Sequence, residues 1–304
     1  MRILVLGATG FLGRHTTRHL HTLPGVRVLV GGRSPDTDLT ADLATADPVR
    51  LADALRALAP DAVVNCSGAV GGGAVHLTGT NARGPAVLCQ ALAEAAPRAR
   101  LVHFGSAAEY GATGVGHTVD ETTPARPLSV YGASKLAGTL AVLDAPLDAV
   151  VLRVFNPLGP GAPTAGLPGR LAAELRRVTP HGPEGTVRVG DLSAHRDFVD
   201  VRDVARAAGL AATTPGAYPR VLNIASGTAR PVRAVAEGLV RESGFRGRLE
   251  ESGGGSDRSA AVSWQQADIA AAGRVIGWQP RHTFADSLAG LWAASVDQAV
   301  VPAR

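Results

Sequence analysis

The chain opens with MRILVLGATGFLG (residues 1–13), and this segment sets the expected architecture. A short apolar run, Arg2–Leu6, ends at Gly7, and a helix-like segment begins at Phe11. Glycines with this spacing let the backbone turn tightly, approach a pyrophosphate and pack a helix against a sheet. The free N–H groups at the start of that helix favour an anion. The sequence therefore predicts a dinucleotide-binding loop made of Gly7, Thr9, Gly10, Phe11, Leu12 and Gly13.

Strand and helix patterns alternate through the N-terminal half of the chain. Further apolar runs of strand length are Val26–Val30, Ala62–Asn65, Leu101–Phe104 and Ala149–Phe155. Helix-like segments between them are Pro48–Leu58, Gly84–Ala96 and Tyr131–Leu143. Continuous apolar strands that alternate with helices are typical of a parallel, doubly wound sheet. We therefore expect an α/β, Rossmann-type fold with a smaller C-terminal α/β substrate domain.

The composition changes after Asn156. Pro157–Pro168 is rich in Pro and Gly, and Glu250–Ser259 contains SGGGS, so both are predicted loops. Phe198–Val201 and Val221–Ala225 still have the pattern of core strands. We therefore assign to a dinucleotide-binding domain residues 1–156, with 196–226 returning to it, and to a substrate-binding domain residues 157–195 and 227–304.

Composition excludes several classes of protein. The chain has 304 residues, of which 45% are hydrophobic and 18% charged, close to globular averages, so intrinsic disorder is excluded. No apolar run approaches the roughly 20 residues that span a bilayer, and the first one is too short for a signal peptide. Basic residues are scattered, the net charge is only +4 and aromatic residues are few, which argues against nucleic acid. We expect a cytoplasmic protein without membrane contact.

Lysine is rare in this chain: of the 30 basic residues 29 are Arg, and Lys135 is the single Lys. This residue closes the segment YGASK (131–135), and on a helix residues four apart share a face, which places Lys135 beside Tyr131. A neighbouring cation lowers the pKa of a phenol from about 10 toward neutrality, where a general acid works best. Ser106 follows the apolar run that ends at Phe104, at the carboxyl edge where such sheets bind ligands. Tyr131, Lys135 and Ser106 are therefore candidate catalytic residues.

The end of the second predicted strand indicates which nicotinamide cofactor binds. An NAD site usually has Asp or Glu there for the ribose 2′-hydroxyl. This chain has Gly31-Gly32-Arg33-Ser34, and Arg33 offers a two-pronged guanidinium to a 2′-phosphate, with a hydroxyl from Ser34. We favour NADPH (NADP), with NAD as the alternative because Asp36 lies close enough to replace the missing acid.

Metal and disulfide chemistry find little support. His15 and His19 have metal-ligand spacing on the first helix, but no third ligand is evident and the neighbouring Thr16–Arg18 indicate a solvated face. Cys66 and Cys89 are the only cysteines, which excludes a disulfide scaffold or a cysteine-rich zinc module. We expect no metal site.

Four segments together resemble the extended short-chain dehydrogenase/reductase family, which contains nucleotide-sugar epimerases, dehydratases and 4-ketoreductases. They are GATGFLG (7–13), GSAAEYG (105–111), YGASK (131–135) and RDFVDVRDV (196–204). GSAAEYG, RDFVDVRDV and VFNPLGPG (154–161) are most similar to nucleotide-sugar 4-ketoreductases such as GDP-4-keto-6-deoxymannose reductase.

The resemblance implies further site residues. Tyr131 matches the proton donor, Lys135 the residue that holds the nicotinamide ribose, Ser106 the hydroxyl that binds the substrate oxygen, and Asn81 the active-site Asn. Cofactor contacts implied in addition are Asp42, Leu43, Ser67 and Gly68; substrate contacts implied are Glu109, Asn156 and Arg196. For Arg196 a structural ion pair with Asp200 or Asp203 is an equal alternative.

Departures from the family pattern narrow the reaction. Ala107 and Ala108 stand where the dehydratases carry Asp and Glu, and the segment lacks the Cys of epimerase-reductases. We expect NADPH-dependent reduction of the 4-keto group of a dTDP- or GDP-linked 4-keto-6-deoxysugar. The alternatives are an NAD-retaining nucleotide-sugar 4-epimerase, a ketoreductase of a non-sugar natural-product intermediate, and a dinucleotide-sensing regulator. The resemblance also implies a homodimer formed through the helices near 84–96 and 131–143.

Overall fold

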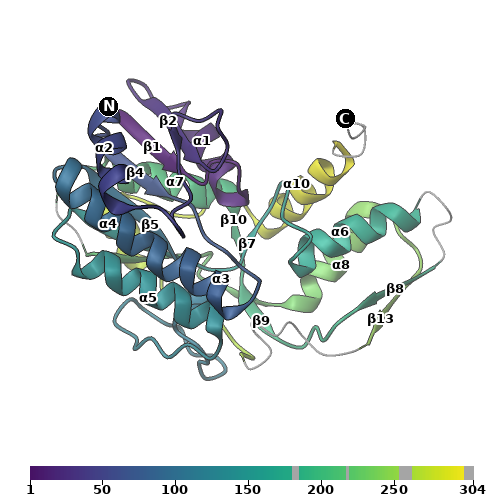
Figure 1. Ribbon diagram of the computed structural model, residues 1–304. Coiled ribbons are helices and arrows are strands. Elements are labelled where there is room, and N and C mark those ends of the chain that lie inside the picture. Colours follow the sequence, from purple (N-terminus) through teal and green to yellow (C-terminus); the bar gives the residue numbers. More distant parts are fainter. Residues whose placement is uncertain (180–184, 217–218, 253–261, 298–304) are drawn as a thin grey trace.

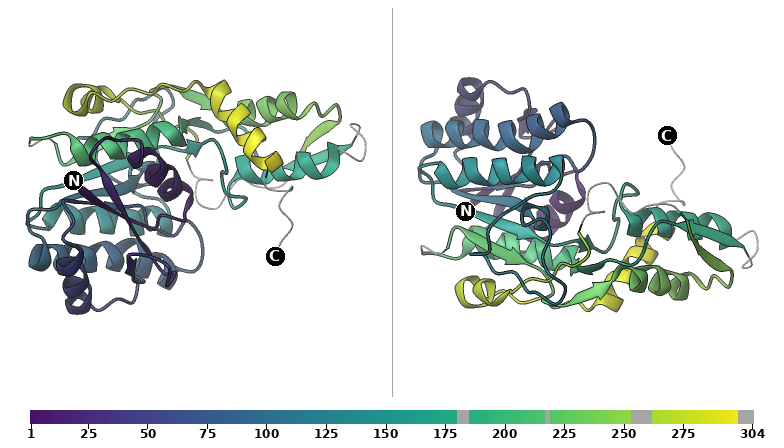
Figure 2. Two further views of the ribbon diagram at one scale, coloured as in Figure 1. Left: turned by 90° about the horizontal axis from the view of Figure 1, so that it is seen from above. Right: turned by 90° about the horizontal axis from the view of Figure 1, so that it is seen from below.

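A seven-stranded parallel sheet with helices on both faces forms the centre of the structure (Figure 1, Figure 2). The computed structural model describes residues 1–179, 185–216, 219–252 and 262–297. The strand order is β3-β2-β1-β4-β5-β6-β11. The chain adds β2 and β3 on one side of β1 and then adds β4 and the later strands on the other side, as in a Rossmann fold. The strands are β1 (Arg2–Leu6), β2 (Arg27–Gly32), β3 (Leu39–Thr40), β4 (Ala62–Asn65), β5 (Arg100–Ser106), β6 (Ala149–Val154) and β11 (Val221–Ile224). The predicted fold class is confirmed.

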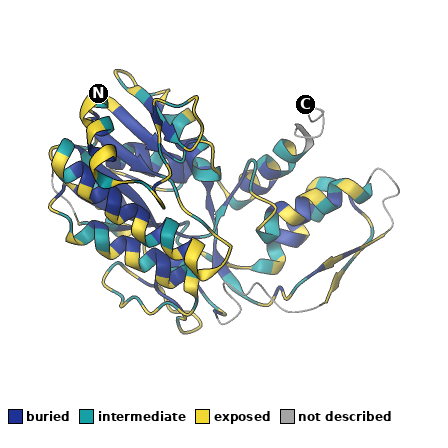
Figure 3. Cartoon of the chain, in the orientation of Figure 1, coloured by how far each residue is buried: buried dark blue, intermediate teal, exposed yellow. Residues whose placement is uncertain are grey.

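Two layers of helices cover this sheet. One face carries α2 (Pro48–Leu58), α4 (Gly84–Ala95) and α5 (Val130–Asp144); the other carries α1 (Phe11–Leu20), α7 (Val201–Thr213) and α9 (Ala270–Ile276). Alternate residues of a strand point to opposite faces, so Ile3 and Val5 enter one core and Leu4 and Leu6 the other. Figure 3 shows the resulting buried strands between helices that are exposed on their outer sides. Burial on both faces explains why the strands are continuous apolar runs.

The face of α1 that carries His15 and His19 packs against α7, so the predicted solvated face is wrong. His15 is buried, and its Nε2 lies 2.9 Å from the carbonyl oxygen of Pro160. A Cβ on Gly209 of α7 would lie 2.8 Å from Cδ2 of His19, so the missing side chain there makes room for the ring. The described residues contain no group of three potential ligands for a metal ion.

A second lobe extends beyond the sheet on the right of Figure 1. Its core lies among three helices and a pair of parallel strands. These elements are α6 (Leu167–Val178), α8 (Val232–Ser243), α10 (Phe284–Asp297), β8 (Thr186–Val189) and β13 (Arg248–Glu251). Two short strand pairs lie outside the main sheet: β7 (Pro157–Leu158) with β10 (Val199–Asp200), and β9 (His195–Asp197) with β12 (Ala229–Pro231). In the described part of the chain, no helix has the length and apolar character that crossing a membrane requires.

Two of the segments that the sequence assigns to one lobe or the other lie elsewhere in the structure. Val221–Ile224 joins the main sheet beside β6. Within Phe198–Val201 only Val199–Asp200 forms a strand, which is buried but pairs with β7 outside the main sheet. Asp200 ends β10 and caps α7, where its carboxylate accepts the backbone N–H of Arg202 at 2.8 Å, so the chain turns into a helix at this point. α9 and Trp278 pack into the core of the first lobe, so assigning all of 227–304 to the second lobe is also wrong.

The glycine loop gives a test of this packing. A Cβ on Gly13 would lie 2.0 Å from the carbonyl oxygen of Gly7, and backbone cannot move aside as a side chain can. We expect Gly13→Ala to lower the free energy of unfolding by about 1–3 kcal/mol, as overpacking does. Gly32→Ala is the matched control, because a Cβ there meets nothing within 4 Å. Thermal melting of both variants checks this, and equal melting temperatures would contradict it.

Candidate active site

A cleft of about 900 Å³ opens at the carboxyl ends of the sheet strands, between the two lobes. This is the edge at which open α/β sheets bind ligands, and the volume suits a small-molecule site. Eleven of the residues predicted from the sequence line it: Gly10, Phe11, Leu12, Ser67, Gly68, Asn81, Ser106, Tyr131, Lys135, Asn156 and Arg196. The structure thus brings together residues that lie far apart in the sequence.

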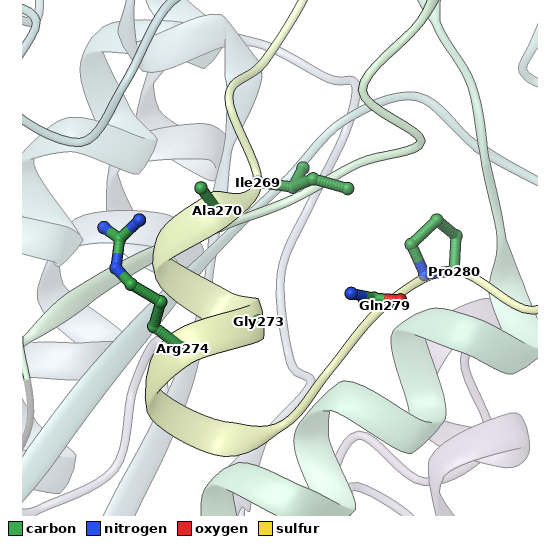
Figure 4. A pocket seen from close by; sticks show the side chains of 6 residues that line it. All are labelled: Ile269, Ala270, Gly273, Arg274, Gln279 and Pro280. Carbon is green, nitrogen blue, oxygen red and sulfur yellow. The ribbon is translucent and has the colours of Figure 1, made fainter.

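A second hollow lies beside α9 (Figure 4). It is lined by Ile269, Ala270, Gly273, Arg274, Gln279 and Pro280. None of these residues was predicted to belong to the site, and only Arg274 and Gln279 have polar side chains. The large cleft is therefore the candidate active site.

The glycine loop after β1 forms one wall of the cleft. Gly7 has a φ of +73°, and a Cβ there would lie 2.8 Å from the backbone nitrogen of Ser67, which follows β4. Gly10 caps α1 without a side-chain hydrogen bond, and the first turn of the helix has no acidic residue. The N–H groups of α1 therefore stay available for an anion at the point where the strand order reverses. This cradle of bare backbone fits the pyrophosphate of a dinucleotide.

The residues predicted for the adenosine end lie outside the cleft, along the same edge of the sheet. Arg33 and Ser34 are exposed directly after β2. The carbonyl oxygen of Ser34 accepts hydrogen bonds from the hydroxyls of Thr37 (2.8 Å) and Thr40 (3.1 Å), which hold this turn. Asp42 is exposed, whereas Leu43 is buried against the α2–α4 face. Arg33 thus has room to meet a ligand from solvent.

Tyr131, Lys135 and Ser106 meet at the floor of the cleft. The hydroxyl of Tyr131, in the first turn of α5, donates to Oγ of Ser106 at 3.4 Å. Lys135, one turn further, is only 5% exposed, and its Nζ donates to the carbonyl oxygen of Phe104 at 2.5 Å. The predicted shared face of Tyr131 and Lys135 is therefore turned toward the end of β5.

Burial lowers the pKa of the Lys135 ammonium from its ordinary 10.5 to about 8. The cause is loss of water around the charge, and the negative charge of Glu109 opposes it by raising the pKa. Loss of water on burial, together with the nearby Lys135 ammonium, lowers the pKa of His103 well below its ordinary value. His103 is therefore a neutral side chain beneath the site.

Asn81 lies in η1, a π-helical turn over Gly79–Arg83 that leads into α4. Its side-chain oxygen accepts the backbone N–H of Ala69 at 2.8 Å, and its amide nitrogen donates to the carbonyl oxygen of Ala69 at 2.8 Å and to Oγ of Ser134 at 3.0 Å. The side chain therefore joins the loop after β4 to α5, next to Lys135. Such π-helical turns are frequent at functional sites.

Asn156 and Arg196 line the cleft on the side of the second lobe. The buried guanidinium of Arg196 donates to the carbonyl oxygens of His195 (2.8 Å) and Val262 (2.6 Å). The acidic residues considered as alternatives are engaged elsewhere. Asp200 pairs with Arg202 at 2.8 Å, and Asp203 pairs with Arg206 and lies 3.1 Å from Nδ1 of His282.

Sequence reasoning missed Gln265, which lines the cleft between Asn156 and η2 (Ala107–Glu109). Its amide oxygen accepts from Nδ2 of Asn156 at 3.3 Å, and its amide nitrogen donates to the carbonyl oxygen of Ala107 at 3.3 Å. Gln265 belongs to the C-terminal part of the chain, far from any recognisable motif, so no local signal marks it.

Glu109 does not reach the cleft, so its prediction as a substrate contact is wrong. Its side chain is fully buried, and its carboxylate turns back on the chain to accept the backbone N–H of Ser106 at 2.7 Å. The second carboxylate oxygen pairs with Nε of Arg153 at 2.9 Å. Glu109 therefore lies next to the candidate site, buried behind the residues that form the floor of the cleft.

Comparison with known proteins identifies the family. The sequence model described as "NAD dependent epimerase/dehydratase family" matches residues 3–225. A dTDP-6-deoxy-L-talose 4-dehydrogenase (NAD(P)(+)) from Kitasatospora kifunensis is 36% identical over 304 residues, covering 96% of this chain and 95% of the relative. A GDP-6-deoxy-D-mannose reductase from Pseudomonas aeruginosa is 29% identical over 253 residues, covering 79% of each chain.

Among solved structures, RMD from Pseudomonas aeruginosa complexed with NADPH has the same fold, with a TM-score of 0.83 and 23% identity over 98% of this chain and 99% of that one. The matched structure agrees with the observed α/β fold. The chain therefore belongs to the NAD dependent epimerase/dehydratase family and is an NAD(P)-dependent oxidoreductase of the extended short-chain dehydrogenase/reductase type.

Proposed function

We propose that this protein reduces the 4-keto group of a nucleotide-activated 4-keto-6-deoxysugar, with NADPH as the reductant. The observation that carries the proposal is the contact of Tyr131 with Ser106 at 3.4 Å, above the buried Lys135, on the floor of the cleft. This arrangement offers a proton and a second hydroxyl to one carbonyl oxygen. The relative from Kitasatospora kifunensis, named as a dehydrogenase at carbon 4 of a dTDP-linked 6-deoxysugar, supports this substrate class.

The roles of the catalytic residues follow from their contacts. When bound, NADPH supplies the hydride that reduces the carbonyl carbon. The hydroxyl of Tyr131 gives its proton to the carbonyl oxygen, and Ser106 donates a hydrogen bond to the same atom. The ammonium of Lys135 favours the phenolate that Tyr131 leaves behind, because opposite charges stabilise each other. Asn81 fixes the loop and the helix that border this site.

We assign the cofactor to the glycine loop and the edge beyond it. Gly7, Thr9, Gly10, Phe11, Leu12 and Gly13 hold the pyrophosphate, and Ser67, Gly68, Tyr131 and Lys135 border the nicotinamide end. Arg33 and Ser34 hold the 2′-phosphate of NADPH, and Asp42 and Leu43 border the adenine. Exposure of Arg33 at the end of β2 supports this assignment, since a guanidinium and a phosphate pair through two hydrogen bonds.

We assign the nucleotide sugar to the side of the cleft that the second lobe forms. Arg196 faces the cleft with a buried positive charge, and such a charge favours a diphosphate. Asn156 contacts the sugar, and Gln265 holds the amide of Asn156 in place. The sugar ring then lies between Arg196 and the floor of the cleft.

Replacing Tyr131 with Phe removes the proton donor and leaves the ring. We expect kcat for reduction of a dTDP- or GDP-linked 4-keto-6-deoxysugar to fall by about 10²–10⁴-fold, the usual contribution of a positioned acid. NADPH affinity, measured by fluorescence titration, should stay within about threefold, because the cradle at Gly7–Gly13 is untouched. A Tyr131→Phe enzyme with the activity of the wild type would refute the proposed mechanism.

Replacing Arg33 with Ala tests the choice of cofactor. Loss of charged hydrogen bonds worth about 1.5–3 kcal/mol should weaken NADPH binding by about 10–100-fold and leave NADH binding unchanged. Arg27→Ala is the matched control, since Arg27 is also exposed but lies at the opposite end of β2. Equal losses for both cofactors would contradict a 2′-phosphate site at Arg33. NAD that stays bound through purification would favour a 4-epimerase instead.

A further inference from the structure

A buried ion pair lies directly beneath the active site, where the mechanism above makes no use of it. Glu109 is fully buried, and its carboxylate pairs with Nε of Arg153 of β6 at 2.9 Å. The guanidinium of Arg153 also lies over the ring of Tyr110, 4.5 Å from its centroid. Burying two charged groups costs desolvation free energy that their attraction often does not recover, so stability alone does not account for this ion pair.

The carboxylate of Glu109 reaches two elements of the active site at once. One oxygen accepts the backbone N–H of Ser106 at 2.7 Å and the hydroxyl of Thr139 at 3.0 Å. Thr139 lies one turn beyond Lys135 on the same face of α5. Glu109 therefore joins the end of β5 to the helix that carries the Lys.

The fold leaves room for this carboxylate. A Cβ on Gly105 would lie 2.7 Å from Oε1 of Glu109 and 2.8 Å from Cγ1 of Val151. Any larger residue at position 105 would therefore displace the carboxylate or the neighbouring strand. Gly105, the first residue of the segment GSAAEYG, therefore leaves the space that the Glu109 carboxylate occupies.

Titratable groups beside Lys135 lie on three elements. Tyr131 lies on its own helix, neutral His103 lies on β5, and Glu109 lies on η2. Among these groups Glu109 carries the negative charge. Its effect on the Lys135 pKa opposes that of burial, and the result is about 8.

We propose that Glu109 is a positioning residue, whose buried carboxylate, held by Arg153, keeps Lys135 charged beside Tyr131 and Ser106. Its catalytic meaning rests on the proposed function, since a charged Lys135 is what favours the phenolate of Tyr131. The charge state itself is a property of the folded chain and is measurable without any substrate.

The single lysine of the chain makes this measurement direct. Protein grown with lysine labelled with ¹³C at the ε carbon gives one lysine ε resonance, that of Lys135, and its shift against pH reports the titration of this one ammonium. In Glu109→Gln the shape and one acceptor oxygen stay and the negative charge is lost, which favours the neutral amine. We expect the midpoint to move to lower pH by about one pH unit relative to the wild type. An unchanged midpoint would overturn the proposal.

Thr139→Val is the matched control, because it removes a hydrogen bond to the same oxygen of Glu109 and leaves the charge in place. Its midpoint should coincide with that of the wild type, and a shift as large as that of Glu109→Gln would assign the effect to packing and overturn the proposal. Loss of one partner of a buried pair can prevent folding. The double variant Glu109→Gln/Arg153→Met removes both charges, and a midpoint below that of the wild type is expected there too; a wild-type midpoint would overturn the proposal.

Kinetics separate this inference from the proposed function. In Glu109→Gln the basic limb of the kcat/KM profile for ketosugar reduction should move to lower pH in step with the midpoint from NMR. A wild-type protein without ketoreductase activity would refute the proposed function, while the resonance of Lys135 would still decide the role of Glu109. An NMR shift without a matching shift of the basic limb would overturn the catalytic part of the inference alone.

Discussion

The active site depends on contact between bare backbones at two glycines of α5. A Cβ on Gly132 would lie 2.5 Å from the carbonyl oxygen of Ala108, and a Cβ on Gly138 would lie 2.1 Å from that of Asn81. Both atoms belong to main chain, which cannot turn away as a side chain does. The helix therefore approaches η2 and η1 closely, and this approach sets the distance from Tyr131 to Ser106. Larger residues at these two positions would separate Tyr131 from Ser106.

The fold and the glycine turn at residues 7–13 were predictable because local patterns determine them. Strands buried on both faces are continuous apolar runs, and the glycines at 7, 10 and 13 are required wherever a strand, a turn and a helix crowd together. The packing of His15 and His19 was not predictable in this way. It depends on α7, which lies far along the chain and presents Gly209 to His19, and on Pro160, whose carbonyl oxygen lies beside His15. Helix faces that meet small residues of a distant helix carry no local sign of burial.

Within the site, spacing on a helix predicted the neighbourhood of Tyr131 and Lys135, because residues four apart share a face. The direction of Glu109 was missed, although a signal for it exists. Ser106-Ala-Ala-Glu109 has the pattern of a capping box, in which the acid turns back to the backbone N–H of the first residue. Attention to this motif would have placed the carboxylate beneath the floor of the cleft. Gln265 has no such motif, since only tertiary contacts bring it to Asn156.

The one lysine in a chain with 29 arginines occupies the place where a guanidinium would fail. Position 135 lies on the buried face of α5 with 5% exposure, and its ammonium ends at the carbonyl oxygen of Phe104. A guanidinium is larger, offers a planar fork and keeps its proton at every physiological pH. An ammonium is compact, and burial brings its pKa to about 8, close enough to neutrality for nearby charges to decide whether it is charged. Substitution by Arg would therefore remove both the fit and the proposed dependence on Glu109.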